Sequence, residues 1–154
     1  AGPTVADIVA NGAFYYGLVR ALAEEDRPVW TRMSFATAEE NLRRAARDGM
    51  NAILYWPGIG EVPAAELVQR TLLPKAYEGL DRWRVDPARR DRLLGIIEGR
   101  CASGQTGASW QIQTVQAIEE SFGTARPEAL RLMTQSYARR MHSNEPVHTW
   151  PIGP

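Results

Sequence analysis

The sequence predicts a mainly α fold, a helical bundle of about five to six helices with one short β-strand near residues 52–56. Two observations predict it. Apolar residues recur every three to four positions over most of the chain, which is the spacing of one helix face. Capping residues, glycines and prolines divide these runs into segments of helix length. The exception is AILYW at 52–56, a β-prone run that Gly49 and the turn Pro57-Gly58-Ile59-Gly60 enclose.

The first predicted helix covers residues 4–25. Thr4 and Asp7 have the spacing of a capping box at its start. A broad apolar stripe follows at helical spacing, made of Val5, Ile8, Val9, Tyr15, Leu18, Val19 and Leu22. Gly12 and Gly17 each weaken a helix by about 1 kcal/mol relative to Ala. We therefore expect these glycines to allow the close approach of a neighbouring element.

The central predicted helix runs from about residue 38 to residue 48. Thr37 is the expected N-cap, Glu40 completes a capping box with it, and Gly49 ends the helix. One face carries small residues against which another element can pack closely, namely Ala38, Leu42, Ala45, Ala46 and Gly49. The arginines 43, 44 and 47 point away from this face.

These arginines have two interpretations. They form opposite-charge pairs at i,i+4 with Glu39, Glu40 and Asp48, which is typical of a solvated helix face. Alternatively, planar guanidinium groups bind phosphate or carboxylate in a bidentate manner, which would make the helix an anion site.

The rest of the chain also reads as helix and turn. Further helices are predicted over residues 63–84, 86–102 and 108–121 and from Pro127 onward. Pro74 is expected to kink or split the first of these. The strand at 52–56 is too short for a sheet of its own, so we expect its partner to come from elsewhere. We predict a helical domain over residues 1–142 and an extended, loosely held tail over residues 143–154.

Composition excludes several classes of protein. The 154 residues suffice for one domain, and 18 basic side chains balance 18 acidic ones, so no net charge attracts nucleic acid or an acidic membrane. Cys101 is the only cysteine, which excludes an internal disulfide and fits a reducing, cytoplasmic compartment. The chain lacks an initiator Met and a signal peptide, and we expect it to be a fragment, a processed chain or an engineered one.

The common nucleotide-binding, redox and metal-binding sequence motifs are absent. The sequence has no GxGxxG, no phosphate-binding GxxxxGK[ST], no CxxC pair and no HExxH. His142 and His148 stand at or near the C-terminus without a third ligand, so no metal site is predicted. The five tryptophans are scattered, which favours packing roles over a stacking platform for bases.

Two segments carry a more specific pattern. Asn41, Ala45, Arg47 and Gly49 have the spacing Asn-x-x-x-Ala-x-Arg-x-Gly, and a β-prone run and a Pro/Gly turn follow. A second segment, residues 104–113, reads GQTGASWQIQ. Both resemble the C-terminal part of the carboxylate–amine ligase family related to bacterial glutamate–cysteine ligases. Three positions depart from that pattern: Met50 replaces the usual Leu, and Leu42 and Arg43 stand where a basic–aromatic pair is common.

The resemblance implies an ATP-dependent ligase that activates a carboxylate, commonly that of glutamate, as an acyl phosphate for attack by an amine. It implies a curved antiparallel sheet backed by helices, with the Mg²⁺-binding carboxylates on strands that precede this region. Such a chain would be the C-terminal helical part of a larger α+β ligase, inactive alone. Arg47 would then contact phosphate or the substrate carboxylate, and Asn41 and Arg44 would help to bind ATP. Trp110 and Gln111 would line the same cleft, although Trp110 also suits a packing role.

Two other functions remain open at this point. The chain would otherwise be a non-catalytic helical interaction or accessory domain, or a small regulatory domain without a ligand. Its expected partners are the missing N-terminal β-sheet portion or another chain, with the amino-acid substrate in the full enzyme. A homo-oligomer is also open, and neither nucleic acid nor a membrane is expected.

Overall fold

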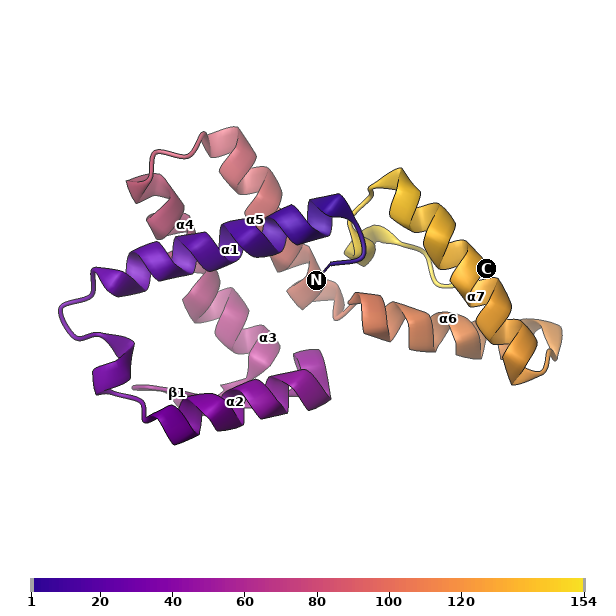
Figure 1. Ribbon diagram of the computed structural model, residues 1–154, viewed down its shortest axis with the longest axis horizontal. Coiled ribbons are helices and arrows are strands. Elements are labelled where there is room, and N and C mark those ends of the chain that lie inside the picture. The colour runs from indigo at the N-terminus through magenta and orange to yellow at the C-terminus, as the bar shows by residue number, and fades with distance from the viewer. Residues whose placement is uncertain (1, 154) are drawn as a thin grey trace.

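The computed structural model describes residues 2–153 and is mainly helical, as predicted (Figure 1). The helices are α1 (Val5–Ala23), α2 (Phe35–Asp48), α3 (Ala64–Leu67), α4 (Leu73–Arg82), α5 (Pro87–Ser103), α6 (Gly107–Phe122) and α7 (Arg126–Ser143). A π-helical stretch, Val68–Leu72, joins α3 to α4, so the described residues form six long helical runs. Short 3₁₀ turns are η1 (Val29–Thr31), η2 (Gly49–Asn51) and η4 (Val147–Thr149).

The molecule has a central group of helices with one unit on either side (Figure 1). Helices α1, α4 and α5 form the centre and share one apolar core, which includes Leu73, Leu80, Leu94 and Ile97. Helix α2 and a hairpin lie to one side, and α6 and α7 lie to the other. The second core joins α6, α7 and the C-terminal segment, with Trp110 at its centre.

Several local signals act as the sequence predicts. Thr4 and Asp7 form a reciprocal capping box at the start of α1. Asp86 caps α5 by accepting a hydrogen bond from the backbone N–H of Arg89, and a proline follows at the first helical position. The π-helical stretch ends at Leu72, two residues before Pro74, and it accommodates a residue that cannot donate a backbone hydrogen bond.

The start of α2 differs from the prediction. Ser34 caps the helix by accepting a hydrogen bond from the N–H of Thr37, so α2 begins at Phe35, three residues earlier than expected. The cap at Thr37 was therefore wrong. Serine and threonine cap helices in the same way, so Ser34, three residues earlier, can take the role that the spacing had given to Thr37.

The predicted strand has a local partner. Strand β1 (Ile53–Trp56) pairs antiparallel with β2 (Gly60–Pro63), with Ile53 opposite Pro63 and Trp56 opposite Gly60. The prediction that the partner of this strand comes from elsewhere was wrong, because the chain turns back at residues 57–59 and forms a hairpin. Gly58 and Gly60 have φ values of 84° and 90°, a region that favours glycine and permits this turn.

Small residues bring α1 and α4 into close contact. A Cβ atom added to Gly17 would lie 2.3 Å from the carbonyl oxygen of Ala76, and one added to Gly79 would lie 1.9 Å from the carbonyl oxygen of Gly17. The close approach expected at Gly17 is thus confirmed. At Gly12 it is not, because an added Cβ there would have nothing within 4 Å.

The C-terminal segment is ordered and packed, contrary to the prediction of a loosely held tail. Val147 is fully buried and Trp150 is 2% exposed, and both belong to the core of α6 and α7. Pro146 and Pro151 disfavour a regular helix here, and the segment still buries its apolar side chains. Within residues 2–153, every helix is too short or too polar to cross a bilayer.

Candidate functional site

Helix α2 binds the hairpin through its polar face. The Asn41 side chain pairs with the backbone of Tyr55: its Oδ1 accepts from the Tyr55 N–H at 2.8 Å, and its Nδ2 donates to the Tyr55 carbonyl oxygen at 2.8 Å. The amide therefore acts like an additional strand residue at the edge of β1. In this structure Asn41 fixes the hairpin to the helix through both polar atoms of its side chain.

Arg44 extends the same contact. Its guanidinium donates to Glu61 Oε1 at 2.8 Å, to Glu40 Oε1 at 3.1 Å and to the carbonyl oxygen of Ile53 at 3.2 Å. These two carboxylates, Glu61 foremost, raise the pKa of Arg44. A shallow hollow of ≈ 330 Å³ lies beside this contact. It is lined by Ala36, Thr37, Glu40, Asn41, Arg44 and Tyr55.

Arg47 lies outside that hollow, and its side chain is 74% exposed. Its Nε and Nη2 donate to the two carboxylate oxygens of Asp48 at 2.9 Å and 2.8 Å. This contact raises the pKa of Arg47 and lowers that of the Asp48 carboxyl. An exposed pair between sequence neighbours contributes little to stability, so an anionic ligand could replace Asp48 at small cost.

Trp110 and Gln111 lie in a different part of the molecule from Arg47 (Figure 1). Trp110 is fully buried, its Nε1 donates to the carbonyl oxygen of Pro151 at 3.0 Å, and its ring lies 5.2 Å from that of Trp150. These contacts favour the packing role for Trp110. The structure does not gather the five predicted site residues into one cluster.

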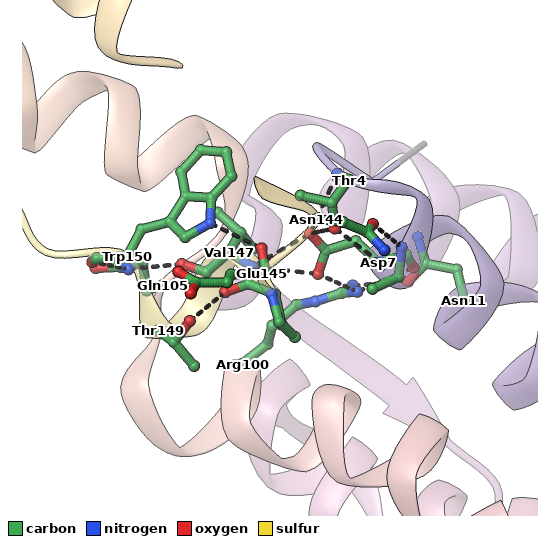
Figure 2. A network of polar contacts seen from close by, with 12 residues as sticks. Thr4, Asp7, Asn11, Arg100, Gln105, Asn144, Glu145, Val147, Thr149 and Trp150 are labelled. Atoms are coloured by element: carbon green, nitrogen blue, oxygen red, sulfur yellow. Dashed lines mark hydrogen bonds and ion pairs between the residues drawn. The ribbon is translucent and has the colours of Figure 1, made fainter. Parts of the chain in front are cut away.

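A buried polar network at the junction of α1, α5 and the C-terminal segment was not predicted (Figure 2). Asp7 is fully buried, and its carboxylate accepts from the Thr4 hydroxyl at 2.8 Å, from Arg100 Nη2 at 3.0 Å and from the Val147 N–H at 3.2 Å. Arg100 Nη1 also donates to Asn11 Oδ1 at 2.6 Å. This network joins three segments that are distant in the sequence.

Gln105 holds the other end of the network (Figure 2). Its Nε2 donates to the carbonyl oxygens of Val147 and Trp150, each at 2.7 Å, and the Trp150 Nε1 donates to the carbonyl oxygen of Glu145 at 2.8 Å. Gln105 belongs to the segment 104–113 that carries part of the family resemblance. Its role here is to anchor the C-terminal segment.

His148 is the titratable group beside this network. Its ring lies against Gly99, where an added Cβ would come within 2.5 Å of it, and its Nδ1 is buried without a hydrogen-bond partner. Burial is the main cause that lowers the pKa of His148; Asp7 opposes the shift and Arg100 adds to it. The folded state therefore favours the neutral imidazole.

We expect the stability of the chain to fall as pH drops below the ordinary histidine value of about 6.5, because the unfolded chain then binds a proton that folded His148 resists. Urea unfolding between about pH 7.5 and about pH 5.5 checks this for His148→Gln, which should lose part of the pH dependence. His142→Gln is the control, since His142 is exposed. Equal pH dependence in both variants would contradict the expectation.

Helix α1 carries a broad exposed apolar surface. The helix packs its small residues inward, including Ala10, Gly17 and Ala21, which are buried. Phe14 and Leu18 also pack against the core. Six other bulky apolar residues are 43–66% exposed and form what we call the α1 face, made of Val5, Ile8, Val9, Tyr15, Tyr16 and Val19. The one charged residue between positions 5 and 19 is the buried Asp7.

Hollows flank the α1 face. One of ≈ 580 Å³ runs between α1 and α5, past Val5, Val9 and Leu93. Another, of ≈ 410 Å³, includes Tyr16 and Trp83. An exposed apolar surface that extends along most of a helix is typical of an interface with another chain or domain.

No protein-family model, no curated protein and no solved structure matches this chain.

Proposed function

We propose that the chain is the C-terminal helical part of an ATP-dependent carboxylate–amine ligase of the glutamate–cysteine ligase type, which forms an amide bond through an acyl phosphate. The α1 face is the observation that carries this proposal. Exposed apolar side chains of this kind are usually covered by another domain or chain with an apolar surface. In such a ligase, the sheet would pack against the α1 face.

The two sides of α1 fit a position between two layers. Ala10, Gly17 and Ala21 let α1 lie close to its helical neighbours, while the larger residues of the α1 face remain for a second layer. A sheet presents a broad apolar surface of this kind, and helices packed on a sheet are one of the common two-layer architectures. In this arrangement α1 would be buried on both sides.

Arg47 is the residue of this chain that we assign to the reaction. Phosphoryl transfer requires positive groups around the migrating phosphate, and a guanidinium binds phosphate oxygens in a bidentate manner. The bidentate contact with Asp48 shows that the side chain already presents its Nε and Nη2 edge to a carboxylate. A phosphate or the substrate carboxylate would take the place of Asp48.

ATP and Mg²⁺ belong to the full enzyme in this proposal. Among residues 2–153 no group of three or more His, Cys, Asp or Glu side chains is placed to hold a metal ion, so the residues present do not fit a Mg²⁺ site. ATP would supply the phosphate that activates the carboxylate. We expect the 154-residue chain alone to hydrolyse no ATP.

Replacing Arg47 tests the proposal. In a protein that joins this chain to its β-rich portion, Arg47→Ala should lower amine-dependent ADP release by about two orders of magnitude or more, while the melting temperature stays within a few degrees, since the side chain is exposed. Arg70→Ala is the matched control, because Arg70 is also an exposed helical arginine paired with a nearby acid. Normal turnover in Arg47→Ala would refute the assignment.

The α1 face also fits the alternative of a non-catalytic interaction domain, with the face covered by a partner protein. The two functions differ in what lies upstream of residue 1 in the gene. A β-rich segment with several Glu or Asp at alternating positions favours the ligase. If the natural protein begins at residue 1, the ligase loses most of its support and the interaction domain is preferred.

A further inference from the structure

The hollow between α1 and α5, which we call the α1–α5 pocket, has the size of a small-molecule site. Its volume is ≈ 580 Å³, and its apolar walls include Val5 and Val9 of α1 and Leu93 and Ile96 of α5. Ligand pockets in proteins are mostly about 300–1,000 Å³ in volume and combine an apolar lining with a few polar groups. The polar groups of this lining therefore indicate what kind of molecule it would bind.

Arg92 is the charged group of the lining. Among residues 2–153 no Asp or Glu lines the pocket, and burial lowers the pKa of His148, which also lines it and is therefore neutral near pH 7. Arg92 has no acidic residue three or four positions away, and its neighbour Asp91 pairs with Arg90 at 2.7 Å. Within the described residues Arg92 forms no ion pair, so its guanidinium can bind a carboxylate in a bidentate manner.

Asn144 adds a hydrogen-bond donor to the lining. Its Oδ1 accepts from the backbone N–H of Ala6 at 2.9 Å, which fixes the orientation of the side-chain amide. Its Nδ2 has no acceptor in the part of the chain that the structure describes. The Thr149 hydroxyl, by contrast, already donates to the carbonyl oxygen of Pro146 at 2.8 Å. A positive charge, a further donor and a lining without acids suit a negatively charged head group.

Gly95 exposes the backbone of α5 to the pocket. It lies in the interior of a 17-residue helix, where glycine is less favourable than alanine. An added Cβ there would have nothing within 4 Å, so no packing neighbour among the described residues accounts for the glycine. Glycine at such a position allows a ligand to approach the backbone closely. The same open space means that a larger side chain at this position would enter the pocket without a clash.

We propose that the α1–α5 pocket binds a monocarboxylic acid with an apolar chain of medium length. Arg92 binds the carboxylate, and the apolar chain lies along Val5, Val9 and Leu93 and over Gly95. The proposal does not rest on the ligase function, since every lining residue belongs to this chain. Val5 and Val9 are also part of the α1 face, so a domain that covers this face would add a further wall to the pocket.

Calorimetric titration of the 154-residue chain with octanoate tests the role of charge. We expect saturable binding at one site. Octan-1-ol, which has the same chain length without the charge, should bind at least about tenfold more weakly. Arg92→Gln should weaken octanoate binding by about the same factor and leave octan-1-ol binding unchanged. Arg89→Gln is the matched control, because Arg89 is exposed on the same helix and lies outside the pocket lining.

A pair of glycine replacements tests the position of the ligand. Gly95→Leu should fill the pocket and abolish octanoate binding. Gly12→Leu should leave it unchanged, because Gly12 is likewise a helix glycine with open space around an added Cβ but lines the other hollow, of ≈ 410 Å³. Circular dichroism and thermal unfolding check that each variant remains folded.

Three results would overturn the proposal. The first is the absence of saturable binding at millimolar octanoate. The second is binding that Arg92→Gln and Gly95→Leu both leave unchanged, which would mean unspecific adsorption to the α1 face. The third is loss of binding in Gly12→Leu but not in Gly95→Leu, which would place the ligand in the other hollow. None of these measurements involves ligase activity or a longer protein, so the two proposals can fail separately.

Discussion

Replacing Gly79 by alanine is expected to destabilise the chain by about 3 kcal/mol or more, because the new methyl group would meet backbone rather than a flexible side chain. Its Cβ would lie 1.9 Å from the carbonyl oxygen of Gly17 and 3.1 Å from the N atom of Ala21. Helices α1 and α4 would have to move apart along the core that they share with α5. Gly17→Ala should act in the same way, since its Cβ would lie 2.3 Å from the Ala76 carbonyl oxygen.

Gly12→Ala is the matched control, because Gly12 lies in α1 together with Gly17. An added Cβ there has nothing within 4 Å, so the gain in helix propensity should stabilise the chain by about 0.5–1 kcal/mol. Urea unfolding of Gly12→Ala, Gly17→Ala and Gly79→Ala gives the comparison directly. If Gly17→Ala and Gly12→Ala had the same stability, the close contact between α1 and α4 would be wrong.

Replacing Asp7 by alanine is the second change with a large expected effect. The substitution removes the carboxylate that accepts from Thr4, Arg100 and Val147, and it leaves the largely buried Arg100 without its counter-charge. Breaking a buried ion pair by removing one partner costs about 3–5 kcal/mol. The free energy of unfolding, measured in urea, should fall by an amount of that order.

The loss should be accompanied by release of the C-terminal segment, because the Val147 N–H loses its acceptor. Limited proteolysis should then cut between residues 143 and 150 sooner than in the parent. Asp26→Ala is the control, since Asp26 is exposed in a loop. Unchanged stability and unchanged proteolysis in Asp7→Ala would contradict the structural role of the network.

The parts of the fold that could be predicted are those that short-range chemistry decides. The capping box of Thr4 and Asp7, the start of α5 at Asp86 and the break before Pro74 each involve groups within a few residues of one another. The helical class follows from the same signals. The sequence also predicted the turn of the hairpin. It did not predict the second strand, because residues 60–63 include a glycine, a glutamate and a proline, which are uncommon in strands.

The inward side of each helix could not be predicted. Periodicity identified the apolar stripe of α1 and the small-residue face of α2, but it gives no information about which element or chain covers them. In the structure, α1 makes its contacts mainly through small residues together with Phe14 and Leu18, and α2 contacts the hairpin through polar residues. For α2 the decisive contact is Asn41 with the Tyr55 backbone, which looks like an ordinary polar position in the sequence.

The buried network escaped prediction for a different reason. Asp7 contacts Arg100 and Val147, which lie 93 and 140 residues away in the sequence. The capping box with Thr4 already accounted for Asp7 in the sequence, so nothing there indicated that its carboxylate has further hydrogen-bond partners. The candidate ligase residues separate in a similar way. Asn41 and Arg44 hold the hairpin and Trp110 packs in the second core, whereas Arg47 is exposed and pairs with its neighbour Asp48.

The burial of α1 in a larger protein is the central claim, and thiol labelling at Val9 measures it most directly. Val9→Cys is placed in a Cys101→Ser background, and its labelling rate is compared between the 154-residue chain and the longer protein of the proposal, in which a β-rich portion precedes this chain. Val9 is 48% exposed, so labelling should be fast in the chain alone and at least about 100-fold slower in the longer protein. Gln135→Cys, at an exposed position of α7, should react quickly in both. Equally fast labelling of Val9→Cys in the two proteins would contradict the claim.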